Sequence, residues 1–196
     1  MEFILASFNE NKAREISRIA APLRAVSLSS LGVKLDFDAV ENGSTYEENA
    51  FKKAAAAAEH VSGIIAADDS GLEVEALGGA PGLISARYGG SGLTDEQRCL
   101  RLLEEMRDIP DHARAARFVC VVAVIFPDGS RRVFTGEQRG VITRELRGSL
   151  GFGYDPVLFI PELGRTVAEL DSDTKNRVSH RAIAFSKFRE FLLEKN

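Results

Sequence analysis

The chain has 196 residues, with 29 acidic and 25 basic side chains and a net charge of −4. A hydrophobic content of 44% excludes a largely disordered protein, and the length suits one domain (residues 1–196) that folds without a metal or disulfide staple. The mild negative charge excludes a general surface for nucleic acid or for an anionic membrane, but it permits a local cluster of cations that binds a phosphate.

The cysteines and the hydropathy pattern indicate the compartment. Cys99 and Cys120 form no CxxC pair and lie among apolar residues, so we expect reduced core thiols. No segment reaches the roughly 18 apolar residues of a membrane span, and the N-terminal residues do not resemble a signal peptide. The sequence therefore predicts a soluble cytoplasmic protein with no membrane anchor.

Short apolar strands alternate with capped helices in the first part of the chain. The expected elements are a strand at 3–6, a helix at 10–21, a strand at 26–28, a helix from 45 to about 61 and a strand at 64–67. Asn9 is the expected N-cap of the first helix, and Thr45 with Glu48 forms a capping box at the second. Five alanines at 54–58 predict close packing on a sheet, and the polar run 68–71 is expected to bound the last strand.

The remainder of the chain predicts a helix, a hairpin, two glycine-rich loops and a C-terminal helix. The expected elements are a loop at 78–92, a helix at 94–107, strands at 117–126 and 132–135, a loop at 148–155, a strand at 157–160 and a helix capped by Ser179. Thr94 and Gln97 form a second capping box. This order of elements predicts an α/β fold: a single mixed-sheet domain with two lobes around a central cleft.

The first polar cluster lies where a strand ends and a helix begins. It consists of Ser7, Phe8, Asn9, Glu10, Asn11 and Lys12. Such a junction presents backbone N–H groups and the positive end of a helix dipole to an anion, and the lysine adds a full charge. A capped turn with a solvated lysine is the commoner alternative on position alone. The cluster is not a P-loop, because neither GxxxxGKS nor GxxxxGKT occurs in the chain.

The second cluster is the run Asp68-Asp69-Ser70 after an apolar strand. Adjacent carboxylates repel one another unless a cation lies beside them, and Mg²⁺ with phosphate oxygens in its shell is the usual solution. The alternative is an Asx-turn, in which one aspartate hydrogen-bonds its own backbone. We favour a metal or catalytic site, since a turn needs only one aspartate. Glu41 is a further acidic candidate, whereas Glu48 is assigned to the capping box.

An aromatic residue between two glycines marks the third cluster, which runs from Ser149 to Pro156. Glycine on either side of Phe152 lets the backbone approach a flat ligand, and the ring can stack on a base. Taken alone, this is an unusual loop and nothing more.

The fourth cluster places four potential cations at the start of the last helix: Lys175, Arg177, His180 and Arg181. The N-terminal end of a helix dipole repels cations, so this placement indicates a bound anion. The alternative is an exposed histidine beside a solvated arginine. Together the four clusters are typical of a nucleoside triphosphate site, with an acidic metal corner, cations for phosphates and an aromatic loop for the base.

In this order the clusters resemble the motifs of the inosine triphosphate pyrophosphatase family, the noncanonical purine NTP pyrophosphatases. The matching segments are Ser7 with Asn9 and Lys12, Glu48–Ala54, Ala67–Leu72, Gly78–Gly82, Ser85–Tyr88, Gly151–Pro156 and Ser179–Arg181. They span essentially the whole chain. Phe8 departs from the pattern, because many relatives carry a small residue there.

The resemblance implies hydrolysis of a nucleoside triphosphate between its α and β phosphates, with Mg²⁺ as the cofactor. The products are the monophosphate and pyrophosphate. The implied substrates are ITP, dITP, XTP and dXTP, and the implied role is to cleanse the nucleotide pool. A homodimer is also implied, and neither nucleic acid nor a membrane is an expected partner.

A role for each matched residue follows from the same resemblance. Asp69 is implied as the general base and a metal ligand, Glu41 as a second ligand and Asp68 as support for the metal site. Lys53, as a catalytic group, and Lys12 would neutralise the triphosphate. Substrate binding is implied for the rest of the first cluster and for Ser70, and the implied base pocket comprises Phe152, Gly153, Tyr154, Asp155, Lys175, His180 and Arg181.

Two alternatives stay open. Maf-like proteins are a sister pyrophosphatase group that acts on other bases, but the Gly-Phe-Gly-Tyr-Asp and Ser-His-Arg motifs argue against them. The second alternative is a nucleotide-binding regulator that does not hydrolyse its ligand. The intact pair Asp68 and Asp69 counts against a loss of catalysis.

Overall fold

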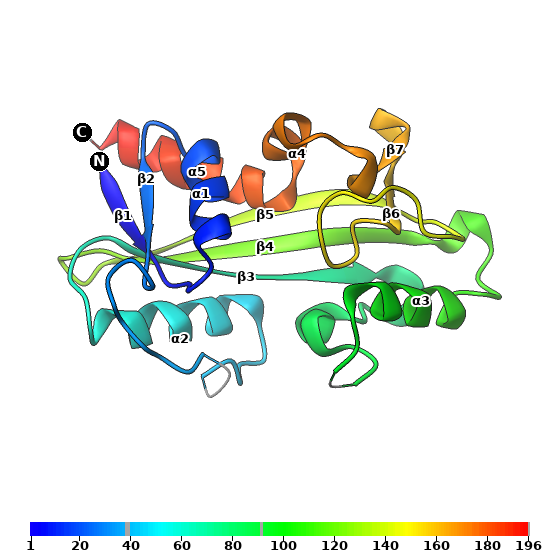
Figure 1. Ribbon diagram of the computed structural model, residues 1–196, viewed down its shortest axis with the longest axis horizontal. Coiled ribbons are helices and arrows are strands. Elements are labelled where there is room, and N and C mark those ends of the chain that lie inside the picture. The colour runs from blue at the N-terminus through cyan, green and yellow to red at the C-terminus, as the bar shows by residue number, and fades with distance from the viewer. Residues whose placement is uncertain (38–39, 91, 196) are drawn as a thin grey trace. The chain divides into compact units, whose positions relative to one another are not determined.

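The computed structural model describes residues 1–37, 40–90 and 92–195. Its strands form one mixed sheet in the order β2-β1-β3-β4-β5-β6-β7 (Figure 1). The elements are β1 (Glu2–Leu5), α1 (Glu10–Ile19), β2 (Arg24–Ser27), α2 (Tyr46–Ala58), β3 (Ile65–Val74), α3 (Asp95–Glu105), β4 (Ala115–Ile125), β5 (Arg131–Ile142), β6 (Leu158–Ile160), β7 (Arg165–Thr166), α4 (Ser172–Val178) and α5 (His180–Glu194). Strand β1 is parallel to β2 and β3, whereas β6 is antiparallel to β5 and β7, so the predicted mixed α/β class is confirmed.

The chain divides into two compact units, in agreement with the two predicted lobes. The first unit comprises Met1–Asp69, Cys120–Gly136 and Asn176–Asn196, and the second comprises Ser70–Val119 and Glu137–Lys175. Within the described residues, no helix combines the length and the apolar character that a membrane crossing requires.

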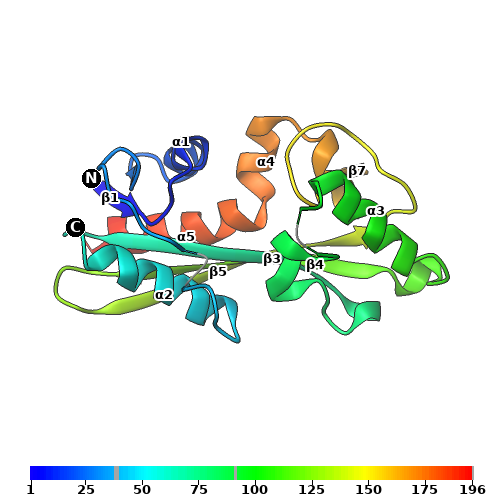
Figure 2. The same ribbon diagram turned by 60° about the horizontal axis from the view of Figure 1, so that its bottom comes forward.

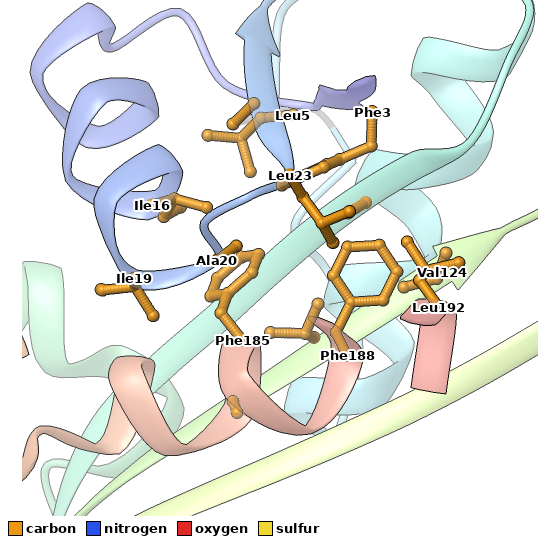
Figure 3. Close-up of a cluster of buried hydrophobic side chains, with 14 of the residues drawn as sticks. Phe3, Leu5, Ile16, Ile19, Ala20, Leu23, Val124, Phe185, Phe188 and Leu192 are labelled. Atoms are coloured by element: carbon orange, nitrogen blue, oxygen red, sulfur yellow. The ribbon is translucent and has the colours of Figure 1, made fainter. Parts of the chain in front are cut away.

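In the first unit, α1 and α5 cover one face of the strands and α2 covers the other (Figures 1 and 2). The side of α1 and α5 is filled by aromatic and aliphatic side chains, among which the rings of Phe3 and Phe188 meet edge to face with centroids 5.1 Å apart (Figure 3). On the other side, Ala50, Ala54 and Ala57 of α2 are fully buried. Alanine lets this helix approach the strands closely, as its composition predicts.

Strand β3 is longer than the sequence indicated, and this corrects one expectation. The run 68–71 does not bound the strand but lies inside it, and the strand continues to Val74. The physical reason is that Leu72 and Val74 continue the alternation of buried side chains beyond the polar run, and both are fully buried. Successive residues of the strand therefore point to opposite faces, which separates Asp68 from Asp69.

The second unit is built around α3 and the ends of β3, β4 and β5. Its core contains Leu72, Leu102, Met106, Phe118 and Leu158. Strand β5 was predicted only to residue 135, because its second half is polar, but it continues to Ile142. Ion pairs explain this continuation, since the guanidinium of Arg117 binds Glu137 at 3.0 Å and Glu73 at 2.8 Å.

The helix caps follow the sequence with one exception. Asn9, Thr45 and Ser179 are the N-caps of α1, α2 and α5, and the capping box of α3 is present. The capping box of α2 is incomplete, because the carboxylate of Glu48 accepts from the backbone N–H of Ser44 at 2.7 Å and not from that of Thr45. Cys99 and Cys120 are buried free thiols, as expected.

Candidate active site

Asp68 is the acidic centre of one face of β3. It is 4% exposed, and its Oδ1 lies 2.7 Å from the ammonium of Lys12 at the start of α1. Its Oδ2 lies 3.5 Å from Nε of Arg181 at the start of α5. Burial by itself raises the pKa of Asp68, but the charges of Lys12 and Arg181 outweigh it and hold that pKa well below its usual range. Asp68 is therefore an ionised group between two cations.

Of the four cations predicted at the start of the last helix, Lys175 and Arg177 lie in α4, and His180 and Arg181 begin α5. Arg181 is buried and also approaches Glu15 of α1 at 3.4 Å, so two carboxylates neutralise it at a helix N-terminus that otherwise repels cations. His180 is the first residue of α5 and is buried, like Arg181. The helix start packs on β5 at Gly136, where a Cβ would lie 2.0 Å from the His180 carbonyl oxygen. Internal carboxylates thus account for the charge of Arg181 at this helix start.

On the other face of β3, one lysine joins two carboxylates. The ammonium of Lys53, on α2, lies 2.7 Å from Oε1 of Glu41 and 3.7 Å from Oδ1 of Asp69. Asn49 of the same helix donates from Nδ2 to Oδ2 of Asp69 at 3.1 Å. Burial lowers the pKa of Lys53, but the charges of Asp69, Asp68 and Glu41 outweigh this effect and raise it. Lys53 is therefore a stable cation at this cluster.

This donor set fits a hard divalent cation. Glu41 and Asp69 share one positive charge, which is the arrangement of oxygens that a small metal ion favours. Outside positions 38–39, 91 and 196, the structure contains no group of three or more acidic, histidine or cysteine side chains poised for a metal. Mg²⁺ suits such a sparse site, because it is commonly held by one or two carboxylates, water and substrate phosphates. Asp68 lies with Lys12 and Arg181 instead, and its support for a metal stays a prediction.

The first cluster is a capped turn with ordered side chains. Asn9 accepts from the backbone N–H of Lys12 at 3.0 Å, and Ser7 accepts from the N–H of Asn9 at 3.2 Å. Three of the predicted binding residues have local partners here. Glu10 is bound by Ser27 and Ser30, Asn11 accepts from Arg14, and the ring of Phe8 packs on Phe37 with centroids 5.3 Å apart. The side chain of Lys12, by contrast, reaches the carboxylate of Asp68.

The glycine-aromatic loop of the second unit holds an exposed ring in a fixed backbone. Phe152 is 56% exposed, and the Lys175 ammonium lies 4.7 Å from its ring centroid. Asp155 is buried, pairs with Lys175 and accepts from the backbone N–H of Phe152 at 3.0 Å. Gly151 has φ +83°, and a Cβ there would lie 2.0 Å from Oδ2 of Asp155. The loop therefore requires glycine and presents Phe152 as a flat surface.

Helix α3 and a short helical segment hold the rest of this loop. The N–H of Gly153 donates to Oδ2 of Asp95 at 2.8 Å, and its carbonyl accepts from the thiol of Cys99 at 3.2 Å. The buried hydroxyl of Tyr154 donates to the carbonyl of Ser85 at 3.0 Å. Both backbone groups of Gly153 are thus bound by side chains of α3.

The predicted site residues fall into two groups. Lys175 lies with Phe152 and Asp155 in the second unit, whereas Arg181 lies with Asp68 in the first, so these base-reading candidates have different partners. Ser70 shares the face of β3 that carries Asp68. Sequence reasoning missed Asn49, Asp95 and Cys99. The spacing of Asn49 and Lys53, four residues apart on one helix, was the signal that could have identified the first.

Comparison with known proteins gives consistent matches over the whole chain. The Ham1 family model matches residues 3–191. The dITP/XTP pyrophosphatase of Clostridium perfringens is 43% identical over 97% of both chains, and that of Geobacter sulfurreducens is 46% identical over 96% of this chain and 95% of its own. The Staphylococcus aureus Ham1 protein structure covers both chains fully, with a TM-score of 0.89 and 38% identity. A HAM1 protein structure from Coxiella burnetii covers 99% of each, with a TM-score of 0.88 and 37% identity.

Proposed function

This chain belongs to the Ham1 family, and we propose that it hydrolyses ITP, dITP, XTP and dXTP to their monophosphates and pyrophosphate. The chain is a nucleoside triphosphate pyrophosphatase, a hydrolase that acts on a phosphoanhydride bond. Its role is to remove noncanonical purine nucleotides from the nucleotide pool. Identities of 43% and 46% to dITP/XTP pyrophosphatases, over nearly the full length of each chain, support this substrate class.

The observation that carries the proposal is the ammonium of Lys53 between Glu41 and Asp69. Cleavage of the α–β anhydride spreads negative charge over phosphate oxygens, so catalysis consists mainly of positioning and electrostatic stabilisation. Asp69 is the general base: its carboxylate accepts a proton from the attacking water. Lys53 orients that carboxylate and contributes positive charge beside the triphosphate.

Mg²⁺ is the proposed cofactor, held by the carboxylates of Glu41 and Asp69. When bound there, it would neutralise charge on the phosphate oxygens. Lys12 and the capped turn of Ser7 and Asn9 would bind phosphates, together with Ser70. Asp68 holds Lys12 and Arg181 in place for this task, since both cations lie on its two oxygens.

The base would bind against the loop of the second unit. Phe152 is exposed for stacking, and the Lys175 ammonium at its ring can donate a hydrogen bond to an oxygen at position 6 of the purine. An adenine amino group would leave such a donor unpaired, which is the physical origin of large selectivities. His180 and Arg181 are proposed to assist in recognising the base and its neighbouring groups.

The assembly and the compartment are proposals as well. We propose a homodimer, which the family resemblance supports, and a cytoplasmic location, which the two free buried thiols support because reducing compartments preserve thiols. Size-exclusion chromatography with light scattering would test the dimer directly.

Pyrophosphate release from inosine, xanthosine, guanosine and adenosine triphosphates with Mg²⁺ tests the function. We expect fast turnover of the first two and slow turnover of the others. Asp69→Asn keeps the shape of the side chain and removes the base, so kcat should fall about 10²- to 10⁴-fold. Full activity in Asp69→Asn would transfer the role to Asp68 or Glu41. No hydrolysis of any purine triphosphate by the wild type would reject the function.

A further inference from the structure

A single amide side chain links one carboxylate of the proposed metal site, that of Asp69, to the segment that carries the other, Glu41. Asn49 lies in α2 and is 5% exposed. Its Nδ2 donates to Oδ2 of Asp69 at 3.1 Å, and its Oδ1 accepts from the backbone N–H of Gly43 at 2.7 Å. Gly43 follows Glu41 by two residues, so Asn49 contacts both the segment that carries one carboxylate and the other carboxylate itself.

The chemistry of the two contacts fixes the orientation of the amide. A backbone N–H can only donate, so it needs the amide oxygen, and an ionised carboxylate can only accept, so it needs the amide nitrogen. Only asparagine offers an acceptor and a donor at this length. An aspartate at position 49 could keep the contact to Gly43 but would turn a second negative charge toward Asp69.

Asn49 and Lys53 act on the same pair of acidic groups from one face of α2. Residues four apart on a helix are neighbours, and both side chains are buried. Lys53 contacts the carboxylates of Glu41 and Asp69, whereas Asn49 contacts Asp69 and the backbone beyond Glu41. Lys53 therefore supplies the positive charge, whereas Asn49 holds Asp69 at a fixed distance from the segment that carries Glu41.

The backbone of Gly43 packs closely against Asn49 and leaves no room for a side chain. A Cβ at Gly43 would lie 2.7 Å from Oδ1 of Asn49 and 2.8 Å from Cβ of Glu48. Glycine at this position thus permits the backbone to reach the amide. An alanine there would clash with Asn49 and Glu48 of α2 and so push the segment and the first turn of the helix apart.

We propose that Asn49 is a positioning residue, which sets the placement of Glu41 relative to Asp69 and so prepares both carboxylates for a divalent cation. This inference rests on the proposed function for its catalytic consequence. It does not require Asn49 to touch the substrate. Loss of the amide should therefore lower metal affinity and kcat and leave KM nearly unchanged.

Two variants break the two contacts separately. Asn49→Asp removes the donor to Asp69, and Gly43→Ala displaces the segment from the amide. The matched control is Lys52→Ala, because Lys52 joins the same helix to the same segment through Oδ1 of Asn42 at 2.7 Å, in an exposed pair. Far-ultraviolet circular dichroism and the unfolding midpoint report whether each variant folds.

The primary measurement is the affinity for Mn²⁺ without nucleotide, by electron paramagnetic resonance, followed by kcat and KM for inosine triphosphate. We expect both variants to bind Mn²⁺ about 10- to 100-fold more weakly and to lose kcat in similar measure, since partners of metal ligands have effects of this size. Lys52→Ala should match the wild type.

The outcomes separate this inference from the proposed function. Wild-type affinity for Mn²⁺ in folded Asn49→Asp and Gly43→Ala would overturn the positioning role, whatever happens to activity. If Asn49→Asp does not fold, Gly43→Ala decides by the same criterion. If the wild type releases no pyrophosphate, the proposed function fails, and the Mn²⁺ comparison still decides the role of Asn49.

Discussion

The two units hold their proposed functional residues by different forces. In the first unit, ion pairs fix the functional side chains: Lys12 and Arg181 on Asp68, and Lys53 between Glu41 and Asp69. In the second unit, hydrogen bonds between side chains and the backbone, together with one ion pair between Asp155 and Lys175, fix a loop whose main functional group is an exposed ring. The ion pairs of the first unit can stabilise charge on a substrate, whereas the loop of the second unit presents an aromatic surface for a base.

This difference predicts which kinetic parameter the residues of each unit control. Groups that stabilise developing charge act mostly in the transition state, so their loss lowers kcat. A stacking surface binds the ground state and the transition state equally, so its loss raises KM. Substitutions in the two units should therefore separate along these two parameters.

After Asp69→Asn, the largest effect is expected at Lys53. Lys53→Met keeps the length of the side chain but leaves Glu41 and Asp69 side by side without their shared cation. Removing one electrostatic group of this kind from an active site costs about 10²- to 10³-fold in kcat. Steady-state pyrophosphate release from inosine triphosphate measures the loss, with KM recorded in the same experiment.

The neighbouring lysine provides the control for this substitution. Lys52 is exposed and bonds to Asn42, so Lys52→Met changes the same helix by the same chemistry away from the acidic pair. It should retain wild-type kcat. An equal loss in both variants would attribute the effect to α2 in general and remove the special role of Lys53.

A smaller effect of the opposite kind is expected at Phe152. Phe152→Ala removes the stacking surface, and stacking of a base on an aromatic ring contributes about 1–3 kcal/mol, so KM should rise about 5- to 150-fold with kcat nearly unchanged. Phe152→Tyr keeps the ring and serves as the control. The preference for inosine over adenosine triphosphate should persist, because a ring face does not distinguish substituents at position 6. A fall in kcat alone would contradict the comparison.

The two units also differed in how far the sequence could predict their functional residues. The loop of the second unit was recognised from its glycines, because a positive φ and a close approach at Gly151 leave a clear signal. The opposite placement of Asp68 and Asp69 was missed, since the polar run was expected to bound the strand. Whether such a run ends a strand depends on Leu72 and Val74 beyond it, and their burial is a tertiary property.

Partners supplied by distant segments were the least predictable. The contact of Asp95 and Cys99 with Gly153 joins positions more than fifty residues apart, and nothing in either segment indicates the other. The cations at the start of α5 gave a signal that was interpreted as an external anion, whereas Glu15 and Asp68 neutralise Arg181 from within the chain. A charge misfit in a sequence thus predicts a partner but not its origin.

The smallest effect is expected at Cys99, whose thiol donates to the carbonyl of Gly153. Burial, together with the charges of Asp95 and Asp155, raises the pKa of Cys99 to about 12, so the group stays a protonated donor at neutral pH. An unfolded thiol has a pKa of about 8.5, so the folded state binds this proton more tightly. The resulting stability is fully present below about pH 8 and is lost as the pH rises toward 12.

Cys120→Ala leaves Cys99 as the one thiol of the chain and allows a direct measurement. Ellman's reagent at pH 8 should react with the folded protein far more slowly than with the protein in denaturant, because only the thiolate attacks. Rapid labelling of the folded protein would mean that Cys99 is an exposed thiolate, and the loop would then lack this donor. As a substitution in the second unit, Cys99→Ala should affect KM, and the rise should be a few-fold at most. The loop keeps two other contacts, because Asp95 still accepts from the N–H of Gly153 and Asp155 still accepts from the N–H of Phe152.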